Sequence, residues 1–184
     1  MAPRRTTYVA LLRAVNLGSH NKISMPVLRE VFGELECEDV ATYVQSGNVV
    51  FRSPRGAGAL RGAIEGALEH EFGVRPAVLL RTKAELQKLV SANPYADRAD
   101  DPRRVHVIFL EGVPDRARVR VFDGDKFAPD EFRLVGRDVF AFYPHGYGRT
   151  KLTNATFEKQ LGVTATSRNW RTVTALADLA AKLE

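Results

Sequence analysis

The sequence has 184 residues, with 27 Lys or Arg against 22 Asp or Glu, a formal net charge of +5 and a pI near 9.6. Apolar residues make up 45% and charged residues 27%, which is ordinary for globular domains and excludes disordered, collagen-like and low-complexity chains. The single cysteine excludes an internal disulfide and a cysteine-rich zinc site. The first apolar run, Tyr8–Leu12, is too short for a secretory signal, and no run approaches the ~20 residues of a membrane span. We therefore expect a reduced, cytoplasmic protein that has no contact with a membrane.

The first half of the chain alternates apolar strands with amphipathic helices. In chain order we expect a strand at Thr6–Arg13, a helix capped by Ser24, strands at Val40–Gln45 and Asn48–Phe51 around a Ser46-Gly47 turn, a helix from Leu60 to Phe72 that ends at Gly73, and a strand at Pro76–Arg81. This βαββαβ order is that of a ferredoxin-like fold. Thr82 and Glu85 form a capping box for the helix that follows.

The second half has nearly the same order of elements. The polar stretch Ala96–Arg104 is the best candidate for a boundary, and it divides the chain into subdomains at 1–95 and 96–184. Beyond it we expect a strand at Val105–Leu110, a helix at Pro114–Phe122, a hairpin of Glu131–Val135 and Val139–Tyr143, a helix at Lys151–Leu161 ended by Gly162, and a last helix at Asn169–Leu183. The sequence thus predicts an α+β fold: a ferredoxin-like half, a second βαββα half and a C-terminal helix. The shared order suggests a structural duplication.

Most motifs that carry chemistry are missing from the sequence. The four histidines lack metal-ligand spacing, and there is no phosphate-binding P-loop, nucleophile elbow or dinucleotide fingerprint. We therefore expect neither a metal nor a cofactor. His106 falls within a strand, where a role in the core is favoured, whereas His145 lies in a turn-prone loop and stays open.

Two polar segments of the first half are candidate binding elements. The loop after the first strand carries Arg13, Asn16, Asn21 and Lys22, and Gln45 and Asn48 bracket the Ser46-Gly47 turn. A loop of this kind can hold an anion through backbone N–H groups and a nearby lysine. Turn geometry is the alternative explanation. It is favoured for Asn16 and Asn21, but it explains Gln45 and Asn48 less well.

A third candidate segment is basic and lies near the start of the helix predicted at 151–161. Arg149 and Lys151 occupy the positive end of the helix dipole, where cations are unfavourable unless an anion sits there. We expect an anion site made by these two side chains and the first-turn amides, with support from Arg168. Tyr143 lies beside this segment and is a further candidate ligand-binding residue.

Two asparagines near this segment are expected to have structural roles. Asn154 shares a helical face with Phe157 and Leu161, so its amide should be buried and bonded to the backbone of residues 163–169. Asn169 should cap the last helix. Trp170 is in register with Val173, which favours a place in the core over a stacking platform for nucleic acid.

The chain resembles a bacterial family known as domain of unknown function 1697. The resemblance is carried by 8–13, Asn16-Leu17-Gly18 with Asn21-Lys22, 42–51, Tyr143-Pro144, 148–154, Phe157-Glu158, 161–163 and 166–173. Ala14 and Ser19 depart from it, because the family usually has glycine there. The resemblance implies an α+β fold with a ferredoxin-like N-terminal part, and it implies no reaction, substrate or cofactor.

We interpret the chain as a non-catalytic module that binds a phosphate-bearing ligand or nucleic acid, since Arg, Lys, Asn and Gln exceed what turns and caps require. One alternative is a small-molecule enzyme with a site between the two halves, in which Lys151 or Tyr143 would donate the proton. Another is a structural or partner-binding protein whose polar clusters are satisfied internally. Oligomeric state does not follow from the sequence.

Overall fold

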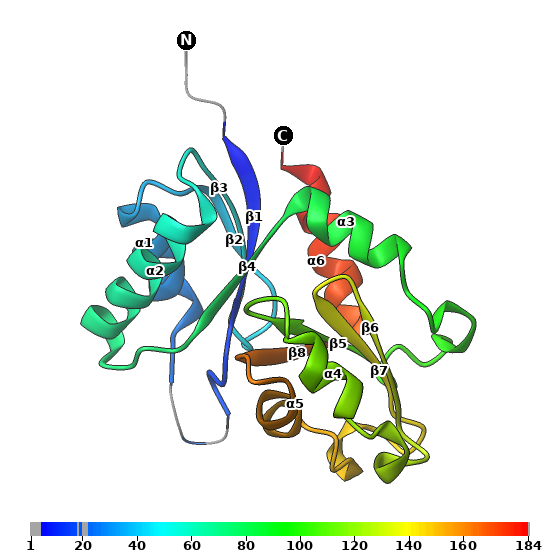
Figure 1. The fold of residues 1–184 in the computed structure, drawn as a ribbon. Helices are drawn as coiled ribbons and strands as arrows, with labels where there is room; N and C mark the ends of the chain where they lie inside the picture. The colour runs from blue at the N-terminus through cyan, green and yellow to red at the C-terminus, as the bar shows by residue number, and fades with distance from the viewer. Residues whose placement is uncertain (1–4, 18, 20–21, 184) are drawn as a thin grey trace. The chain divides into compact units, whose positions relative to one another are not determined.

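The computed structural model describes residues 5–17, 19 and 22–183 (Figure 1). Its contacts divide the chain into two compact units, one of residues 1–88 with 175–184 and one of residues 89–174. Each unit is built on a four-stranded antiparallel sheet. The α+β class predicted from the sequence is confirmed.

The first unit has the expected βαββαβ order. Its elements are β1 (Thr6–Leu12), α1 (Met25–Glu34), β2 (Glu38–Thr42), β3 (Asn48–Ser53), α2 (Ala57–Phe72) and β4 (Val78–Thr82), followed by α3 (Lys83–Ser91). The strand order β2-β3-β1-β4 is that of a ferredoxin-like sheet with β1 at its centre. The predicted capping box is also present, because Thr82 Oγ1 accepts from Glu85 N and Glu85 Oε2 accepts from Thr82 N.

The second unit contains one strand more than the sequence predicts. Its elements are η1 (Ala96–Arg98), β5 (Val105–Leu110), α4 (Arg116–Val121), η2 (Gly124–Phe127), β6 (Glu131–Val135), β7 (Asp138–Phe142), η3 (Tyr147–Arg149), α5 (Asn154–Leu161), β8 (Ala165–Asn169) and α6 (Trp170–Lys182). The unpredicted strand is β8, which is short and polar and runs directly into α6 without a turn signal. Its pairing with β5 gives the order β6-β7-β5-β8, so this unit is βαββαβ as well.

The two units correspond residue by residue at their last strands. Val9 pairs with Arg81 in the first sheet, and Val107 pairs with Arg168 in the second. Each arginine donates from Nη1 to the carbonyl of the residue before it, over 2.8 Å in both cases. The duplication that element order suggests is therefore present in strand order, in register and in this arginine geometry.

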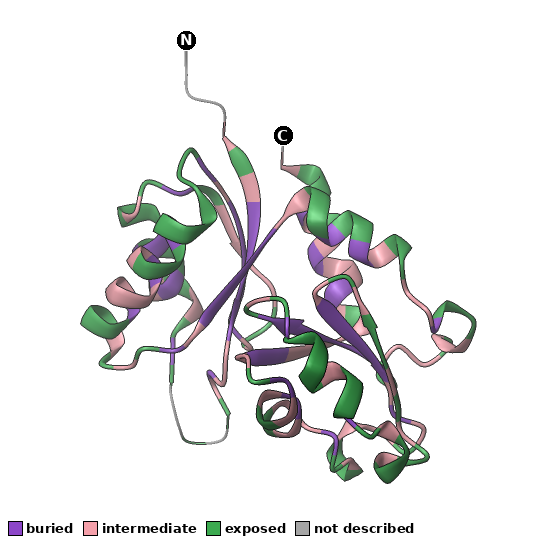
Figure 2. Cartoon of the chain, in the orientation of Figure 1, coloured by how far each residue is buried: buried purple, intermediate pink, exposed green. Residues whose placement is uncertain are grey.

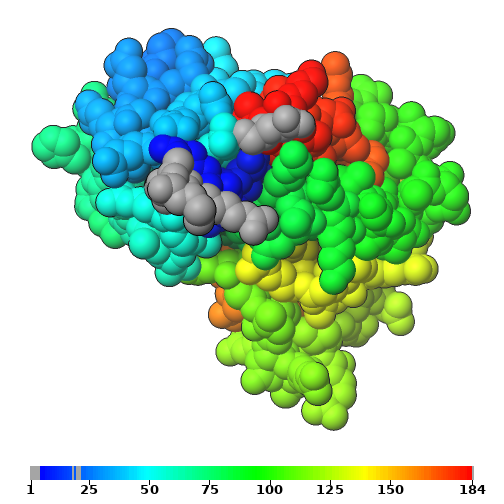
Figure 3. Space-filling view, turned by 90° about the horizontal axis from the view of Figure 1, so that it is seen from above, coloured from blue at the N-terminus to red at the C-terminus, as the bar shows by residue number. Residues whose placement is uncertain are grey.

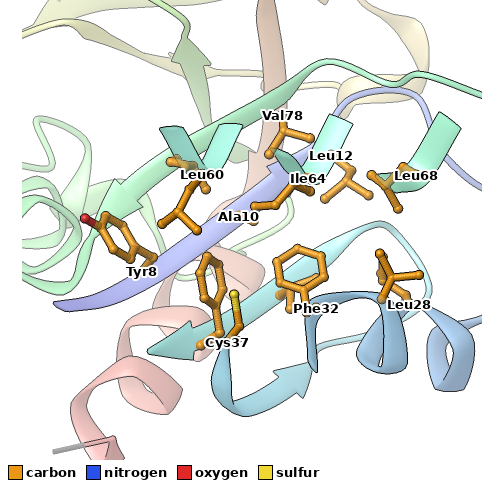
Figure 4. Close-up of a cluster of buried hydrophobic side chains, with 14 of the residues drawn as sticks. Tyr8, Ala10, Leu12, Leu28, Phe32, Cys37, Leu60, Ile64, Leu68 and Val78 are labelled. Carbon is orange, nitrogen blue, oxygen red and sulfur yellow. The ribbon is translucent and has the colours of Figure 1, made fainter. Parts of the chain in front are cut away.

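The core of the first unit lies between its sheet and α1 and α2. Alternate residues of β1, namely Tyr8, Ala10 and Leu12, face Phe32 and Ile64 from the two helices (Figure 4). Figure 2 shows the buried positions following the strands. A fully buried leucine or phenylalanine side chain stabilises a fold by roughly 1.5–3 kcal/mol, so this layer fixes the position of both helices.

The end of α6 packs against the start of α3. Lys83 Nζ donates to the carbonyls of Ala181 and Leu183 over 3.3 and 3.4 Å, and Thr7 Oγ1 donates to Leu183 O over 3.4 Å. The green and red segments lie side by side in Figure 3. These contacts explain why the last residues of the chain group with the first unit.

Gly47 is held tightly in the connection between β2 and β3. Its φ is +73°, and a Cβ atom at this position would lie 2.5 Å from Val15 Cγ2 and 2.7 Å from Leu12 Cβ. Gly136 occupies the β6–β7 turn with a φ of +64°, but nothing lies within 4 Å of its Cβ position. The two glycines thus share a left-handed backbone and differ in the space around them.

We expect Gly47→Ala to destabilise the protein more than Gly136→Ala. Both substitutions place a side chain on left-handed backbone, at a cost of about 1–2 kcal/mol. Only Gly47→Ala adds overpacking, a further ~1–3 kcal/mol. Urea unfolding of both variants measures the difference, and equal losses of unfolding free energy would contradict the packing argument.

Candidate functional site

The residues that the sequence singles out fall in both units, and each unit has its own set. Those in the first unit are Arg13, Asn16, Lys22, Gln45 and Asn48, and those in the second are Tyr143, Arg149, Lys151 and Arg168. Asn21, also expected to bind the ligand, lies outside the described residues.

In the first unit, the Asn16 side chain joins two loops. Asn16 Nδ2 donates to Ile23 O over 3.0 Å and to Gln45 O over 2.9 Å, and Asn16 Oδ1 accepts from Ile23 N over 2.8 Å. The residue has a positive φ of 53°, which asparagine tolerates better than most residues. The amide is thus engaged in holding the loops together, as the turn-geometry alternative expects.

Asn48 has a similar role in the β2–β3 connection. Its side chain is buried, and Nδ2 donates to Tyr43 O over 3.0 Å and to Ser46 Oγ over 2.8 Å. Lys22 and Gln45 are exposed, and Arg13 is half-buried where its backbone N–H donates to Ala77 O. The amides of Asn16 and Asn48 therefore shape these loops rather than present free donors to a ligand.

The second unit contains a pocket that is lined by several basic side chains. It has a volume of about 430 Å³ and is formed by residues 126–130 and by the connection between β7 and α5. Its polar lining consists of Lys126, Asp130, His145, Arg149, Thr150 and Lys151. We call it the basic pocket. Arg149 and Lys151 thus line one cavity, which Lys126 and the histidine left open by the sequence also line.

The charge of the basic pocket is positive. Lys126, Arg149 and Lys151 are exposed cations, and Asp130 is the acidic side chain in the lining. Asp130 Oδ2 accepts a hydrogen bond from Thr150 Oγ1, and Lys126 lies 3.4 Å from Asp123. Within the described ranges, the side chains of Arg149 and Lys151 have no hydrogen-bond or ion-pair partner. Cations gathered in this way repel one another, and a bound anion would relieve the repulsion.

An aromatic layer beneath the basic pocket holds its loop in place. The Tyr147 ring stacks on His106 at a centroid distance of 4.7 Å, and Tyr143 meets both rings edge-on at 5.4 and 5.1 Å. Tyr143 is fully buried and its hydroxyl donates to Leu152 O over 3.0 Å. Burial raises the pKa of Tyr143 far above its ordinary value. Tyr143 therefore positions the loop and does not line the pocket.

The start of α5 differs from the prediction. The helix begins at Asn154, not Lys151, because the Thr153 side chain caps it by accepting from Thr156 N. Lys151 therefore precedes the first turn, and its carbonyl accepts from Thr156 Oγ1 over 2.7 Å. Arg149 and Lys151 of the expected anion site line the basic pocket together, whereas Arg168, expected to support them, is not in its lining.

Arg168 has its own environment on β8. Its Nη1 donates to Thr166 Oγ1 over 2.9 Å and to Ser167 O over 2.8 Å. Burial lowers the pKa of Arg168 to about 10, so the side chain is still charged at neutral pH. These bonds fix the guanidinium against its own strand.

The two asparagines with expected structural roles behave differently. Asn169 Oδ1 accepts from Thr172 N over 2.9 Å and so caps α6. Asn154 does not make the predicted bond to residues 163–169, because its Oδ1 is buried without a hydrogen-bond partner in the described part of the chain. The carboxylate of Glu158, one turn later on α5, bonds to Ala165 N instead.

A family model described as "Protein of unknown function (DUF1697)" matches residues 5–140, which is more than half of the chain. The chain belongs to the DUF1697 family. This confirms the resemblance read from the sequence. The match ends before residues 145–151, which form one side of the basic pocket.

A conserved bacterial protein of Streptococcus pneumoniae, SP0830, has the same fold as this DUF1697 protein. The TM-score is 0.76 at 23% sequence identity, over 96% of this chain and 99% of the other. No curated protein sequence matches the DUF1697 chain. In the described ranges, no helix is long and apolar enough to cross a membrane, and no group of three His, Cys, Asp or Glu side chains could hold a metal ion.

The buried imidazole of His106 should make the unfolding free energy of the protein depend on pH. Burial lowers the pKa of His106 to about 4, against about 6.5 in an unfolded chain. Between these values the unfolded state binds more protons, so the unfolding free energy falls as pH drops from ~6.5 to ~4, by about 3 kcal/mol. Above pH ~6.5 the contribution is constant.

We expect urea unfolding between pH 4 and 7 to show this loss in the wild type and a smaller one in His106→Phe. His70→Gln, which removes an exposed histidine of α2, should keep the wild-type dependence. The same pH dependence in all three proteins would contradict a buried neutral His106.

Proposed function

We propose that this protein is a non-catalytic binding module that holds a small phosphate-bearing ligand in the basic pocket. The observation that carries the proposal is the convergence of Lys126, Arg149 and Lys151 on one cavity whose acidic lining residue, Asp130, is already bonded to Thr150. A cytoplasmic setting fits the single cysteine, since reduced thiols are the rule there.

The donors of the basic pocket suit a phosphoryl group. Arginine offers a planar fork of N–H donors that matches two phosphate oxygens, and lysine adds a compact charge. Hydrogen bonds to charged groups contribute roughly 1.5–3 kcal/mol each. The volume of about 430 Å³ lies within the ~300–1,000 Å³ of ordinary small-molecule pockets. It is larger than a phosphate ion requires, which favours a phosphate that is attached to a further group.

Single-stranded nucleic acid is the less favoured ligand. Such ligands stack their bases on exposed aromatic rings. Here the ring of Tyr147 lies on His106, and Trp170 packs against Phe140 at a centroid distance of 6.1 Å. Catalysis is also less favoured, because Tyr143, one of the two expected proton donors, is bonded to Leu152 O and has a strongly raised pKa.

Calorimetric titration with inorganic phosphate tests the proposal. We expect the wild type to bind phosphate and Arg149→Ala or Lys151→Ala to weaken the affinity by about tenfold or more, since each loses a charge-assisted hydrogen bond. Without phosphate, these variants should be as stable as the wild type or slightly more stable, because like charges are separated.

Lys159→Ala is the matched control, since it removes an exposed lysine of α5 that does not line the basic pocket. It should bind phosphate like the wild type. Failure of the wild type to bind phosphate, or equal affinities in all variants, would contradict the proposal. Salt-dependent binding of a random oligonucleotide without phosphate binding would indicate a nucleic-acid ligand instead.

A further inference from the structure

The lining of the basic pocket includes a carboxylate beside its cations. Asp130 lines the cavity together with Lys126, Arg149 and Lys151. In the described part of the chain, Asp130 forms no ion pair with these three side chains, and Lys126 pairs with Asp123 instead. A site that only attracted anions would gain nothing from a carboxylate, because a carboxylate repels them. The place of Asp130 in this pocket therefore calls for a further explanation.

Hydrogen bonds fix both the backbone and the side chain of Asp130. Its backbone N–H donates to Phe127 O over 2.9 Å. Its Oδ2 accepts from Thr150 Oγ1, and Thr150 Oγ1 in turn accepts from Leu152 N over 2.8 Å. A hydroxyl has one proton to donate, and that of Thr150 is directed to Asp130. The carboxylate is thus held in the pocket as an acceptor and is not free to swing away from a bound anion.

The second carboxylate oxygen of Asp130 is left for a ligand. Asp130 is half-buried, and its Oδ1 has no hydrogen-bond or ion-pair partner among the residues that the structure describes. An ionised carboxylate has only acceptor sites. A ligand that covers Oδ1 must therefore bring a hydrogen-bond donor, because an acceptor that is removed from water without a new partner weakens binding.

Phosphate and sulfate differ in whether they bring such a donor. Both are tetrahedral oxyanions of nearly the same size, and both can accept from lysine and arginine side chains. Inorganic phosphate keeps at least one proton near neutral pH, and a phosphate monoester keeps one in its monoanionic form, whereas sulfate has none. A phosphoryl O–H group can donate to Asp130 Oδ1 in a charge-assisted hydrogen bond. A sulfate oxygen in the same place would meet a like charge.

We infer that Asp130 is a specificity-determining residue, which accepts a hydrogen bond from a protonated phosphoryl group and so selects phosphate over sulfate. This inference rests on the function proposed above, and it names the form of the ligand as a phosphoryl group that retains a proton. The cations of the basic pocket attract any oxyanion, and Asp130 rejects those that have no donor. Attraction by the cations alone predicts no preference for phosphate, since sulfate has at least as much charge.

Calorimetric titrations with sodium phosphate and sodium sulfate, at about pH 8 and equal ionic strength, test the inference. Under these conditions both ions are mainly dianions, so the comparison isolates the effect of the phosphate proton. We expect the wild type to bind phosphate about tenfold more tightly than sulfate or better. The difference corresponds to one hydrogen bond to a charged group, which only phosphate can make with Asp130.

Asp130→Asn tests the residue directly. The amide oxygen of asparagine can still accept from Thr150, and its NH₂ group then presents a donor where the carboxylate presented an acceptor. We expect the affinity for sulfate to rise until the two anions differ by less than about threefold. A variant that has lost its fold cannot gain affinity for sulfate, so this result would separate specificity from stability.

Asp125→Asn is the matched control, because it removes an exposed negative charge of η2 that does not line the basic pocket. It should keep the wild-type preference for phosphate. Equal affinities for the two anions in the wild type, with phosphate still bound, would overturn the inference and leave the proposed function standing. An unchanged preference in Asp130→Asn, or its loss in Asp125→Asn, would overturn the inference as well. If neither anion binds, the proposed function fails and this inference fails with it.

Discussion

The stacking of Tyr147 on His106 is the interaction on which the candidate site depends. His106 belongs to β5, the central strand of the second sheet, whose six residues are all buried. Tyr147 belongs to η3, and residues 145–146 before it and 149–151 after it line the basic pocket. A rigid strand therefore sets the position of a loop that would otherwise be free to move. The Tyr143 bond to Leu152 O fixes the far end of the same loop. The aromatic contacts stabilise the loop conformation in which Arg149 and Lys151 line the same pocket.

Local patterns in the sequence were sufficient for most of the fold. The apolar alternation of β1 and the helical spacing of Leu60, Ile64 and Leu68 predict elements that the structure contains. Errors arose where a single hydrogen bond decides a boundary. α5 starts three residues later than its periodicity suggests, because the Thr153 hydroxyl caps it. β8 escaped prediction because its sequence, Ala-Thr-Ser-Arg-Asn, is polar and its identity as a strand depends on pairing with β5.

The site was only partly predictable for a related reason. Arg149 and Lys151 attract attention as neighbouring cations, and they line the same pocket. Lys126 also lines this pocket, but it does not stand out in the sequence. It lies in a different segment, and only tertiary packing brings it to the pocket of Arg149 and Lys151. Turn geometry was the favoured role for Asn16 and explained Asn48 less well, and in the structure both amides bond to the backbone, that of Gln45 and that of Tyr43. Whether a polar side chain is available to a ligand depends on partners distant in sequence, and no local pattern carries that information.

The duplicated fold shows which parts of the chain build the candidate site. The two sheets share strand order and register, and the two units differ in the lengths of their helices and of their connections. The first unit passes from β3 to α2 through residues 54–56, whereas the second passes from β7 to α5 through residues 143–153. Likewise, residues 35–37 join α1 to β2, whereas residues 122–130 join α4 to β6. These two longer connections supply the whole lining of the basic pocket.

Extra chain of this length must be ordered at an entropic cost that the shorter connections avoid. The first unit makes the same two connections with three residues each, so the strand order itself does not require the extra length. The added residues are best explained by what they bring together, which is a set of cations on a scaffold already stabilised by its sheet.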